Sequence, residues 1–298
     1  MLAGGYATLA TGHGLLAAGC WLLAANVRAM KIGYQGERYS YSDRAALEMF
    51  PAGDLTGYPS FVAAFAALAA AEVERLVLPI ENTTTGSVLQ VLDRLVDAPA
   101  RIVAEHQVEV RHALLALPGA GLEDIKQVRS HPEALAQAES LISARGWQPI
   151  PTHDTAGAVR QTAEHQNPAE AALAPPEAAA PHNLEVLLRG VVDRAHNTTR
   201  FVVLVSGEPP IAAHANKSSI AFETQHRPGA LALALTELGL RGANLTRIES
   251  RPTDTPWRYR MFVDLVHTPG PDGFLEVFHP LPGSMSELHH LGTYRAEI

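Results

Sequence analysis

The sequence has little of three features that would each indicate a class of function. Its 298 residues include one cysteine, Cys20, which excludes an internal disulfide and a cysteine-rich metal site. Lys and Arg number 23 against 31 Asp and Glu, and a net charge of −8 argues against a nucleic-acid partner. The longest apolar stretch is shorter than the ~20 residues that a membrane-spanning helix requires, so no membrane partner is expected.

Signatures of several catalytic centres are also missing. The 14 histidines are scattered, and His289-His290 has no spaced carboxylates beside it, so no metal site is predicted. Residues 33–36 lack the further glycine that a dinucleotide-binding loop needs. No Ser–His–Asp or Cys–His pattern specifies a nucleophile. The length is enough for two domains, each with its own core.

Residues 1–29 differ from the rest of the chain. They contain a single charge, Arg28, and an apolar stretch at 15–25 that no basic segment precedes, whereas a secretory signal would have one. Met30-Lys31-Ile32 is typical of the start of a cytosolic chain. We expect 1–29 to be an upstream start or a disordered extension outside the fold, rather than an export signal, and the protein to be cytoplasmic.

From residue 30 to 207, short strands alternate with helices, which is the pattern of an α/β domain. Apolar and extended segments predict strands at 31–34, 75–79, 101–117 (two strands broken near Gln107), 127–130, 148–152, 171–175, 185–189 and 201–205. Helical periodicity predicts helices at 43–49, 58–72, 86–95, 132–145 and 156–164.

A second unit follows a linker predicted over 208–216, where Gly207-Glu208-Pro209-Pro210 opens a polar stretch. Its elements are predicted at 218–224, 230–240, 245–250, 258–266, 274–278 and 288–294. They follow the order βαββαβ, which favours a ferredoxin-like α+β domain over 217–298.

Polar residues gather at three predicted strand-to-helix turns, at 81–87, 130–133 and 154–157. Helix N-termini expose unpaired N–H groups and a positive dipole end, so several of them together would bind an anion. In open α/β sheets such turns meet at the carboxyl ends of the strands. Capping explains each turn alone, but residues 81–87 carry more hydroxyls than one helix end needs, which predicts a ligand-facing surface.

A fourth polar segment, His196-Asn197-Thr198-Thr199-Arg200-Phe201, runs into the apolar strand 202–205. Thr199 and Arg200 should point to opposite faces, as strand neighbours do. Arginine offers a fork of donors suited to carboxylates, and a threonine hydroxyl can donate to a leaving oxygen. Taken alone, the segment is better explained as a capped strand with an edge arginine.

These segments together resemble the prephenate dehydratase family over about residues 31–298. Residues 78–88 are similar to its P-I-E-N-[ST]-x-x-G-S motif, 130–137 to S-H-x-x-A-L-x-Q, 154–158 to its substrate-site turn and 197–201 to N-x-T-R-F. In the second unit, 227–231 and 249–252 are similar to the two phenylalanine-binding motifs of the family's ACT domain. In the first family motif, Tyr39 stands where the family has a glycine.

The resemblance implies a two-lobed catalytic domain over 30–207, like the type II periplasmic-binding-protein fold, and an ACT domain over 217–298. It implies a cofactor-free conversion of prephenate into phenylpyruvate, carbon dioxide and water, on the route to L-phenylalanine. Thr199 would donate to the leaving hydroxyl and Arg200 would hold a carboxylate. The substrate-binding residues would be Ser42, Asn82, Thr83, Gly86, Ser87, Thr155, Ala156, Gly157, Asn197 and Phe201.

The resemblance also implies feedback by phenylalanine, bound between two ACT domains of a homodimer or homotetramer. Its site would be formed by Gly229, Ala230, Leu231, Asn244, Leu245, Glu249, Ser250, Arg251 and Pro252. An ACT domain kept only for dimerisation is the plainer alternative. Two other functions stay open: an arogenate dehydratase, whose substrate differs by one keto-to-amino change, and a non-enzymatic two-lobed ligand-binding protein, against which Thr199, Arg200 and the second unit argue.

Overall fold

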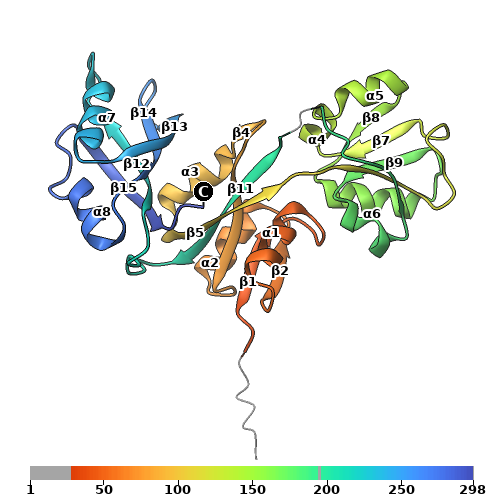
Figure 1. The fold of residues 1–298 in the computed structure, drawn as a ribbon, viewed down its shortest axis with the longest axis horizontal. Helices are drawn as coiled ribbons and strands as arrows, with labels where there is room; N and C mark the ends of the chain where they lie inside the picture. Colours follow the sequence, from red (N-terminus) through yellow and green to blue (C-terminus); the bar gives the residue numbers. More distant parts are fainter. Residues whose placement is uncertain (1–27, 194–195, 298) are drawn as a thin grey trace, which may run out of the picture.

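The computed structural model describes residues 28–193 and 196–297, so the extension predicted over 1–29 lies almost entirely outside the described residues. The described chain forms three bodies in a row, each built on its own sheet (Figure 1). A first lobe stands in the centre, a second lobe lies to its right and a C-terminal domain to its left. The predicted combination of a two-lobed α/β unit with a smaller α+β domain is confirmed.

The first lobe is built around a mixed sheet with the order β2-β1-β3-β11-β5. Its strands are β1 (Lys31–Gln35), β2 (Asp54–Tyr58), β3 (Arg75–Asn82), β5 (Ala100–Glu109) and β11 (Thr198–Ser206), with the short β4 (Gly86–Ser87) paired to β3. The helices are α1 (Tyr41–Met49), α2 (Phe61–Ala69) and α3 (Leu89–Asp97). The apolar runs of β3 and β11 form the buried centre, which is why both read as near-continuous hydrophobic sequence.

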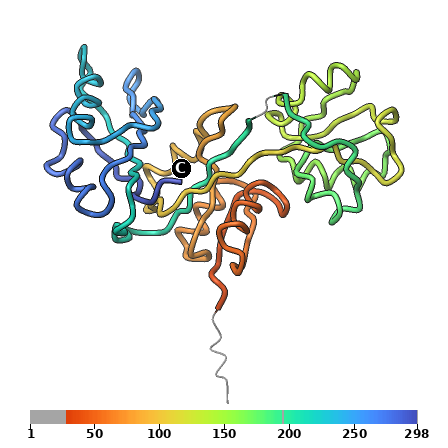
Figure 2. Tube along the Cα trace, viewed as in Figure 1, coloured from red at the N-terminus to blue at the C-terminus, as the bar shows by residue number. Residues whose placement is uncertain are grey.

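The second lobe has the sheet order β10-β6-β9-β7-β8. Its strands are β6 (Ala113–Ala116), β7 (Gln127–Ser130), β8 (Gln148–Pro151), β9 (Glu170–Ala174) and β10 (Glu185–Arg189), and its helices are α4 (Pro132–Ala136), α5 (Glu139–Arg145) and α6 (Thr155–His165). The chain enters this lobe after β5 and returns before β11, so two segments join the lobes (Figure 2). Two crossings at one side are the arrangement of a hinge.

The C-terminal domain has the predicted βαββαβ order. Its elements are β12 (Lys217–Thr224), α7 (Ala230–Leu240), β13 (Asn244–Pro252), β14 (Tyr259–Val266), α8 (Gly270–Phe278) and β15 (Met285–Tyr294), in the antiparallel order β13-β14-β12-β15. The two helices cover one face of this sheet. Phe262, Leu291 and Tyr294 from the other face belong to the core of the first lobe.

Two predicted helix starts are wrong. Residues 86–87 form a strand that pairs with β3, and the helix predicted from residue 86 begins at Leu89. The reason is Asn82, whose Oδ1 accepts from the backbone N–H groups of Thr84 and Thr85 and turns the chain into a hairpin. Tyr58 ends the unpredicted strand β2, and Ser60 caps the helix that follows.

Candidate active site

A pocket of about 180 Å³ lies between the two lobes, where the first sheet faces the helices of the second. It is lined by Gln35, Gly36, Ser40, Tyr41, Ser42, Asn82, Val110, His112, His131, Glu133, Ala134, Gln137, Asp154, Thr155 and Thr199. This volume is below the roughly 300–1,000 Å³ of drug-sized sites, which suits a small metabolite. Within the described ranges, no group of three or more His, Cys, Asp or Glu side chains is arranged to hold a metal ion.

Three helix N-termini reach this pocket, those of α1, α4 and α6. Two of them are turns that the sequence predicted, whereas α1 takes the place of the predicted turn at 81–87. The caps use some of the exposed N–H groups: Ser40 Oγ accepts from Asp43 N at 3.2 Å and Asp154 Oδ1 from Gly157 N at 2.6 Å. Gly157 N–H is therefore engaged within its own helix, and the helix ends contribute chiefly their dipoles to the pocket.

Four side chains form a closed ring of hydrogen bonds, and two of them, Asn82 and Gln137, line this pocket. Asn82 Nδ2 donates to Asn197 Oδ1 at 2.7 Å, and Asn197 Nδ2 donates to Gln137 Oε1 at 2.5 Å. Gln137 Nε2 donates to Thr84 Oγ1 at 3.1 Å, and Thr84 Oγ1 returns to Asn82 Oδ1 at 2.6 Å. The members come from the first lobe, the returning crossing and α4 of the second lobe. This amide ring (Asn82, Thr84, Gln137, Asn197) thus links the lobes without any charge.

The amide ring determines the direction of the Thr199 hydroxyl hydrogen. A backbone N–H can only donate, so the 2.8 Å contact from Thr84 N fixes Asn82 Oδ1 on that side and turns Nδ2 towards β11. Asn82 Nδ2 then donates to Thr199 Oγ1 at 2.9 Å. With this lone pair occupied, the hydroxyl hydrogen of Thr199 is free to point into the pocket that the residue lines. The arrangement presents a hydrogen-bond donor to whatever oxygen binds there.

An aromatic pair lines the pocket. Tyr41 Oη lies 3.2 Å from His112 Nδ1; His112 is buried and Tyr41 is half-buried. Burial lowers the pKa of His112 to about 4 and raises the pKa of Tyr41. The imidazole is therefore neutral at physiological pH. Among the described residues that line the pocket, none is Lys or Arg.

The structure brings together part of the predicted substrate site. Thr199, Asn82, Ser42 and Thr155 line the pocket, and Asn197 belongs to the amide ring. The other predicted positions lie elsewhere: Thr83 Oγ1 accepts from Thr198 N, Gly86 and Ser87 form the hairpin strand, Gly157 N–H donates to the helix cap Asp154, and Ala156 and Phe201 are buried in the cores. Ser87 Oγ points to the C-terminal domain, where it donates to Glu249 Oε2 at 2.9 Å.

Arg200 requires the clearest correction. It is absent from the pocket lining, because alternation along β11 sends its side chain to the opposite face from Thr199. There its guanidinium donates to Glu105 Oε2 at 2.6 Å and to Asp264 Oδ2 at 2.6 Å. In this structure Arg200 is an internal ion-pair residue, and the carboxylate-binding role predicted for it has no geometric basis.

Tyr39 occupies the place of the family glycine at a glycine-like conformation, with φ of 68°. Its N–H donates to Asp43 Oδ2 at 2.8 Å, which helps to hold this strained turn. The ring leaves the pocket and packs edge-on against His182 of the second lobe, with centroids 6.1 Å apart. The tyrosine therefore strains the loop at the pocket edge without filling the pocket.

The predicted phenylalanine-binding residues separate into two places within one chain. Gly229, Ala230 and Leu231 line a pocket of about 350 Å³ at the start of α7, together with Arg258, Tyr259 and Met261. The positions from Asn244 to Pro252 form the edge strand β13 and do not line that pocket. On this strand Arg251 forms a two-pronged ion pair with Asp93 of α3, with distances of 3.0 and 2.9 Å.

Most of the residues that line the pocket were not among the predicted site residues, and neither was Thr84 of the amide ring; Tyr41, His112 and Gln137 are the most informative of them. Gln137 ends the quoted S-H-x-x-A-L-x-Q motif, and its spacing of four from Glu133 places both on one helix face, which was an available signal. Thr84 lies in the polar run at 81–87. His112 lies on a crossing between lobes, and only the tertiary arrangement brings it to the pocket.

The model of the family "Prephenate dehydratase" matches residues 32–209, and the model of the ACT domain matches residues 218–283. Arogenate dehydratase/prephenate dehydratase 2, chloroplastic, of Arabidopsis thaliana is 40% identical over 231 residues, which are 76% of this chain and 60% of the relative. The chain therefore spans about 60% of the length of this plant relative. Prephenate dehydratase of Mycobacterium marinum is 34% identical over 279 residues, which are 89% of this chain and 88% of the relative.

Two solved structures share the fold over most of the chain. Prephenate dehydratase from Arthrobacter aurescens, in complex with L-Phe, has a TM-score of 0.77 and 28% identity and covers 90% of each chain. A structure described as GqqA, a novel type of quorum-quenching acylase, has a TM-score of 0.80 and 30% identity and covers 90% of this chain and 98% of its own.

Proposed function

Because the chain belongs to the prephenate dehydratase family, we propose that it converts prephenate into phenylpyruvate, carbon dioxide and water. The observation that carries this proposal is the Thr199 hydroxyl, which Asn82 holds at 2.9 Å with its hydrogen free for the pocket. This is the donor that a leaving hydroxyl group requires.

The reaction breaks two bonds of the substrate and gains an aromatic ring. The electron pair of the carbon–carboxylate bond moves into the ring as carbon dioxide leaves, and the ring hydroxyl departs with its own bonding pair as hydroxide, which takes a proton from solvent to become water. Negative charge develops on that oxygen in the transition state. The Thr199 O–H donates to it, and a fixed donor aimed at developing charge lowers the barrier more than it stabilises the ground state.

The substrate carboxylates would be held by the helix ends. The N-termini of α1, α4 and α6 face the pocket, and Ser42 and Thr155 add donors at two of them. In this proposal the helix dipoles and hydroxyls replace Arg200, whose guanidinium is engaged elsewhere.

A second candidate is arogenate dehydration, favoured by one specific observation. Glu133 and Asp154 line the pocket, which therefore carries two carboxylates and, among its described lining residues, no Lys or Arg. A carboxylate can pair with the ammonium group of arogenate, whereas the corresponding keto group of prephenate is uncharged and forms no ion pair with it. The plant relatives named for arogenate dehydratase agree with this candidate.

The proposal includes feedback by L-phenylalanine at the ACT domain of a cytoplasmic homodimer or homotetramer. The pocket at Gly229–Leu231 supports a ligand site, and φ of 78° at Gly229 exposes backbone to it. A second chain would bring strand β13, with Glu249 to Pro252, towards this pocket. The solved relative with L-Phe supports the identity of the effector.

The test is product formation by the purified full chain from prephenate and from arogenate, each with and without L-phenylalanine, with Thr199→Val as the matched variant. Phenylpyruvate formed by the native chain and suppressed by L-phenylalanine supports the whole proposal. Phenylalanine formed faster from arogenate would replace the substrate with the second candidate. Binding of either acid without turnover in the folded chain would favour a ligand-binding protein.

A further inference from the structure

A buried cluster of charges lies directly behind Thr199, on the opposite face of β11. Three cations, Arg200, Lys217 and Arg247, meet three carboxylates, Glu81, Glu105 and Asp264. The side chains of Glu105 and Asp264 are 1% and 2% exposed, and that of Arg200 is 11% exposed. We refer to these six residues as the interdomain charge cluster, because the first lobe and the ACT domain each supply three of them.

Arg200 is the member of the cluster next to Thr199, and like Lys217 and Arg247 it joins the two domains. Its guanidinium donates to Glu105 of β5, to Asp264 of β14 and, at 2.8 Å, to Tyr294 Oη of β15. Ser219 of β12 completes the ACT side, with Oγ 2.6 Å from Asp264 Oδ1 and 2.7 Å from Tyr294 Oη. One side chain of strand β11 is therefore held by two strands of the ACT sheet, β14 and β15, and Ser219 of β12 supports both of its partners.

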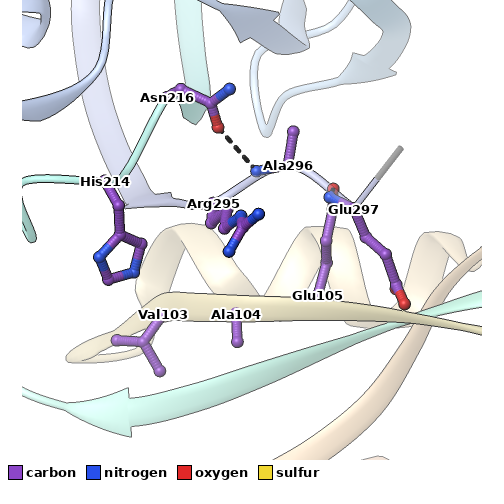
Figure 3. Close-up of a pocket in the computed structure, with 8 residues that line it drawn as sticks. All are labelled: Val103, Ala104, Glu105, His214, Asn216, Arg295, Ala296 and Glu297. Atoms are coloured by element: carbon purple, nitrogen blue, oxygen red, sulfur yellow. Dashed lines mark hydrogen bonds between the residues drawn. The ribbon is translucent and has the colours of Figure 1, made fainter.

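The cluster is also anchored from the end of the chain. Lys217 Nζ donates to both oxygens of Glu105, at 3.0 and 2.7 Å, and Glu297 N donates to Glu105 Oε1 at 2.8 Å. Figure 3 shows the pocket of about 570 Å³ beside this anchor, in which the last residues pass over β5 and Asn216 accepts from Ala296 N. Both oxygens of Glu105 thus accept hydrogen bonds from other groups, which holds the carboxylate in place. Because Arg200 Nε donates to this carboxylate, its position is fixed as well.

The two neighbours of β11 hold it differently at this point. Its pairing with β3 shifts register between Arg200 and Phe201, because β3 carries an extra residue, Ile80. Its pairing with β5 is continuous from Thr198 to Val203. A bulge disrupts the ladder locally, so on the β3 side the position of Thr199 depends more on what holds its neighbour Arg200 than it would between two regular strands.

We propose that Arg200 is a positioning residue, through which the ACT domain holds the Thr199 hydroxyl in its catalytic place. Arg247 brings strand β13 into the same cluster, with Nη1 3.7 Å from Asp264 Oδ2. Because β13 also carries Glu249 to Pro252, a displacement of the ACT strands reaches Thr199 through one shared set of carboxylates. Buried ion pairs add little net stability but specify one arrangement, which is the role assigned to them here.

The inference rests on the proposed dehydratase function for its kinetic readout, and hydrogen exchange supplies a readout that does not. Arg200→Gln should lower kcat about 10- to 100-fold with KM within about twofold, since a misplaced group costs about that much. Tyr294→Phe keeps every charge, so it tests the same link without burying an unpaired ion, and should lower kcat about fivefold. In both variants the amides of residues 198–201 should exchange about tenfold faster.

The matched control is Asp93→Asn, which breaks the other ion pair between the first lobe and the ACT domain without touching β11. It should leave kcat and the exchange of residues 198–201 unchanged. Equal losses of kcat in Asp93→Asn and Tyr294→Phe would mean that Arg200 contributes only general packing between the domains, and would overturn the proposal. Unchanged amide exchange of residues 198–201 in Arg200→Gln would also overturn it. A native chain inactive on both prephenate and arogenate would remove the proposed function, and the exchange data would still decide the role of Arg200.

Discussion

The first lobe meets its two neighbours through contacts of different chemistry. Towards the second lobe the contacts at the pocket are neutral: the amide ring, Tyr41 with His112, and the edge of Tyr39 on His182. An ion pair that joins these lobes, Glu37 with Arg160 at 3.3 Å, is exposed to solvent. Towards the ACT domain they are a buried charge cluster and a shared apolar core. Gly292 of β15 approaches the Ile102 carbonyl so closely that a β-carbon has no room there.

This difference predicts which boundary moves. A neutral hydrogen bond contributes about 1 kcal/mol net, because water replaces the partner when the contact opens. Removing one partner of a buried ion pair costs about 3–5 kcal/mol, since the remaining charge is left without compensation. The lobes can therefore part to admit substrate while the ACT domain stays attached to the first lobe.

The largest expected effect lies on the neutral side. Thr199→Val keeps the shape and removes the hydroxyl, so kcat should fall about 100- to 1,000-fold, or roughly 3–4 kcal/mol, the scale of one lost transition-state donor. Thr199→Ser retains the donor and should keep kcat within about tenfold of the native value. Steady-state kinetics of the two variants decide the point, and a fully active valine variant would remove Thr199 from the mechanism.

The next effect is a pH dependence that also belongs to the neutral side. The pKa of His112 is about 4 in the folded chain and about 6.5 when unfolded, so between these values the unfolded state binds the extra proton. The contribution of His112 to the free energy of unfolding is therefore fully present above about pH 6.5. It is lost as the pH drops to 4, and the loss amounts to about 3 kcal/mol.

Urea unfolding between pH 4 and 7 measures this loss, and His112→Gln is the control. His290 has the same lowered pKa of about 4 and should leave a residual slope in the variant. The carboxylate of Asp264 titrates below this window, because Arg200 and Arg247 outweigh its burial and hold its pKa below the usual value. An unchanged slope in His112→Gln would contradict the assignment.

A smaller effect is expected from breaking the amide ring itself. Asn82→Asp has no side-chain donor at neutral pH, so both Thr199 Oγ1 and Asn197 Oδ1 lose their hydrogen bond. We expect kcat to fall about 10- to 30-fold, or roughly 1.5–2 kcal/mol, which corresponds to two such bonds. Thr85→Val is the control, because its hydroxyl lies 3.5 Å from the same amide at the limit of a hydrogen bond. Equal activities of the two variants would show that the ring does not orient Thr199.

Much of the fold and part of the candidate site could be predicted from the sequence. Periodicity located most strands and helices, because each element buries one apolar face, and the ordered motifs located Thr199 and Asn82. Alternation along β11 correctly separated Thr199 from Arg200. It could not say which face meets the pocket, since that depends on a domain that begins some 16 residues later and supplies Asp264.

The errors have two physical causes, one local and one tertiary. The polar run at 81–87 was interpreted as a helix start because hydroxyls and an asparagine suit both a cap and a turn. The amide of Asn82 settles the choice through Thr84 and Thr85, which is a local contact that composition does not encode. His112 lies on a crossing between the lobes and Gln137 in the second lobe, and only the tertiary packing brings them within one pocket.

The smallest expected effect tests whether all charges at the ACT boundary are equivalent. Arg251 and Asp93 pair at 2.9 Å with side chains 24% and 46% exposed, so solvent screens them. Asp93→Asn should lower the free energy of unfolding by at most about 1 kcal/mol, and by less at high salt. Lys217→Met, which leaves Glu105 buried beside one cation fewer, should cost several times more and should be insensitive to salt. Urea unfolding at low and high ionic strength measures the loss of unfolding free energy in both variants. Equal losses would mean that the buried cluster contributes no more to the attachment of the ACT domain than a surface ion pair does.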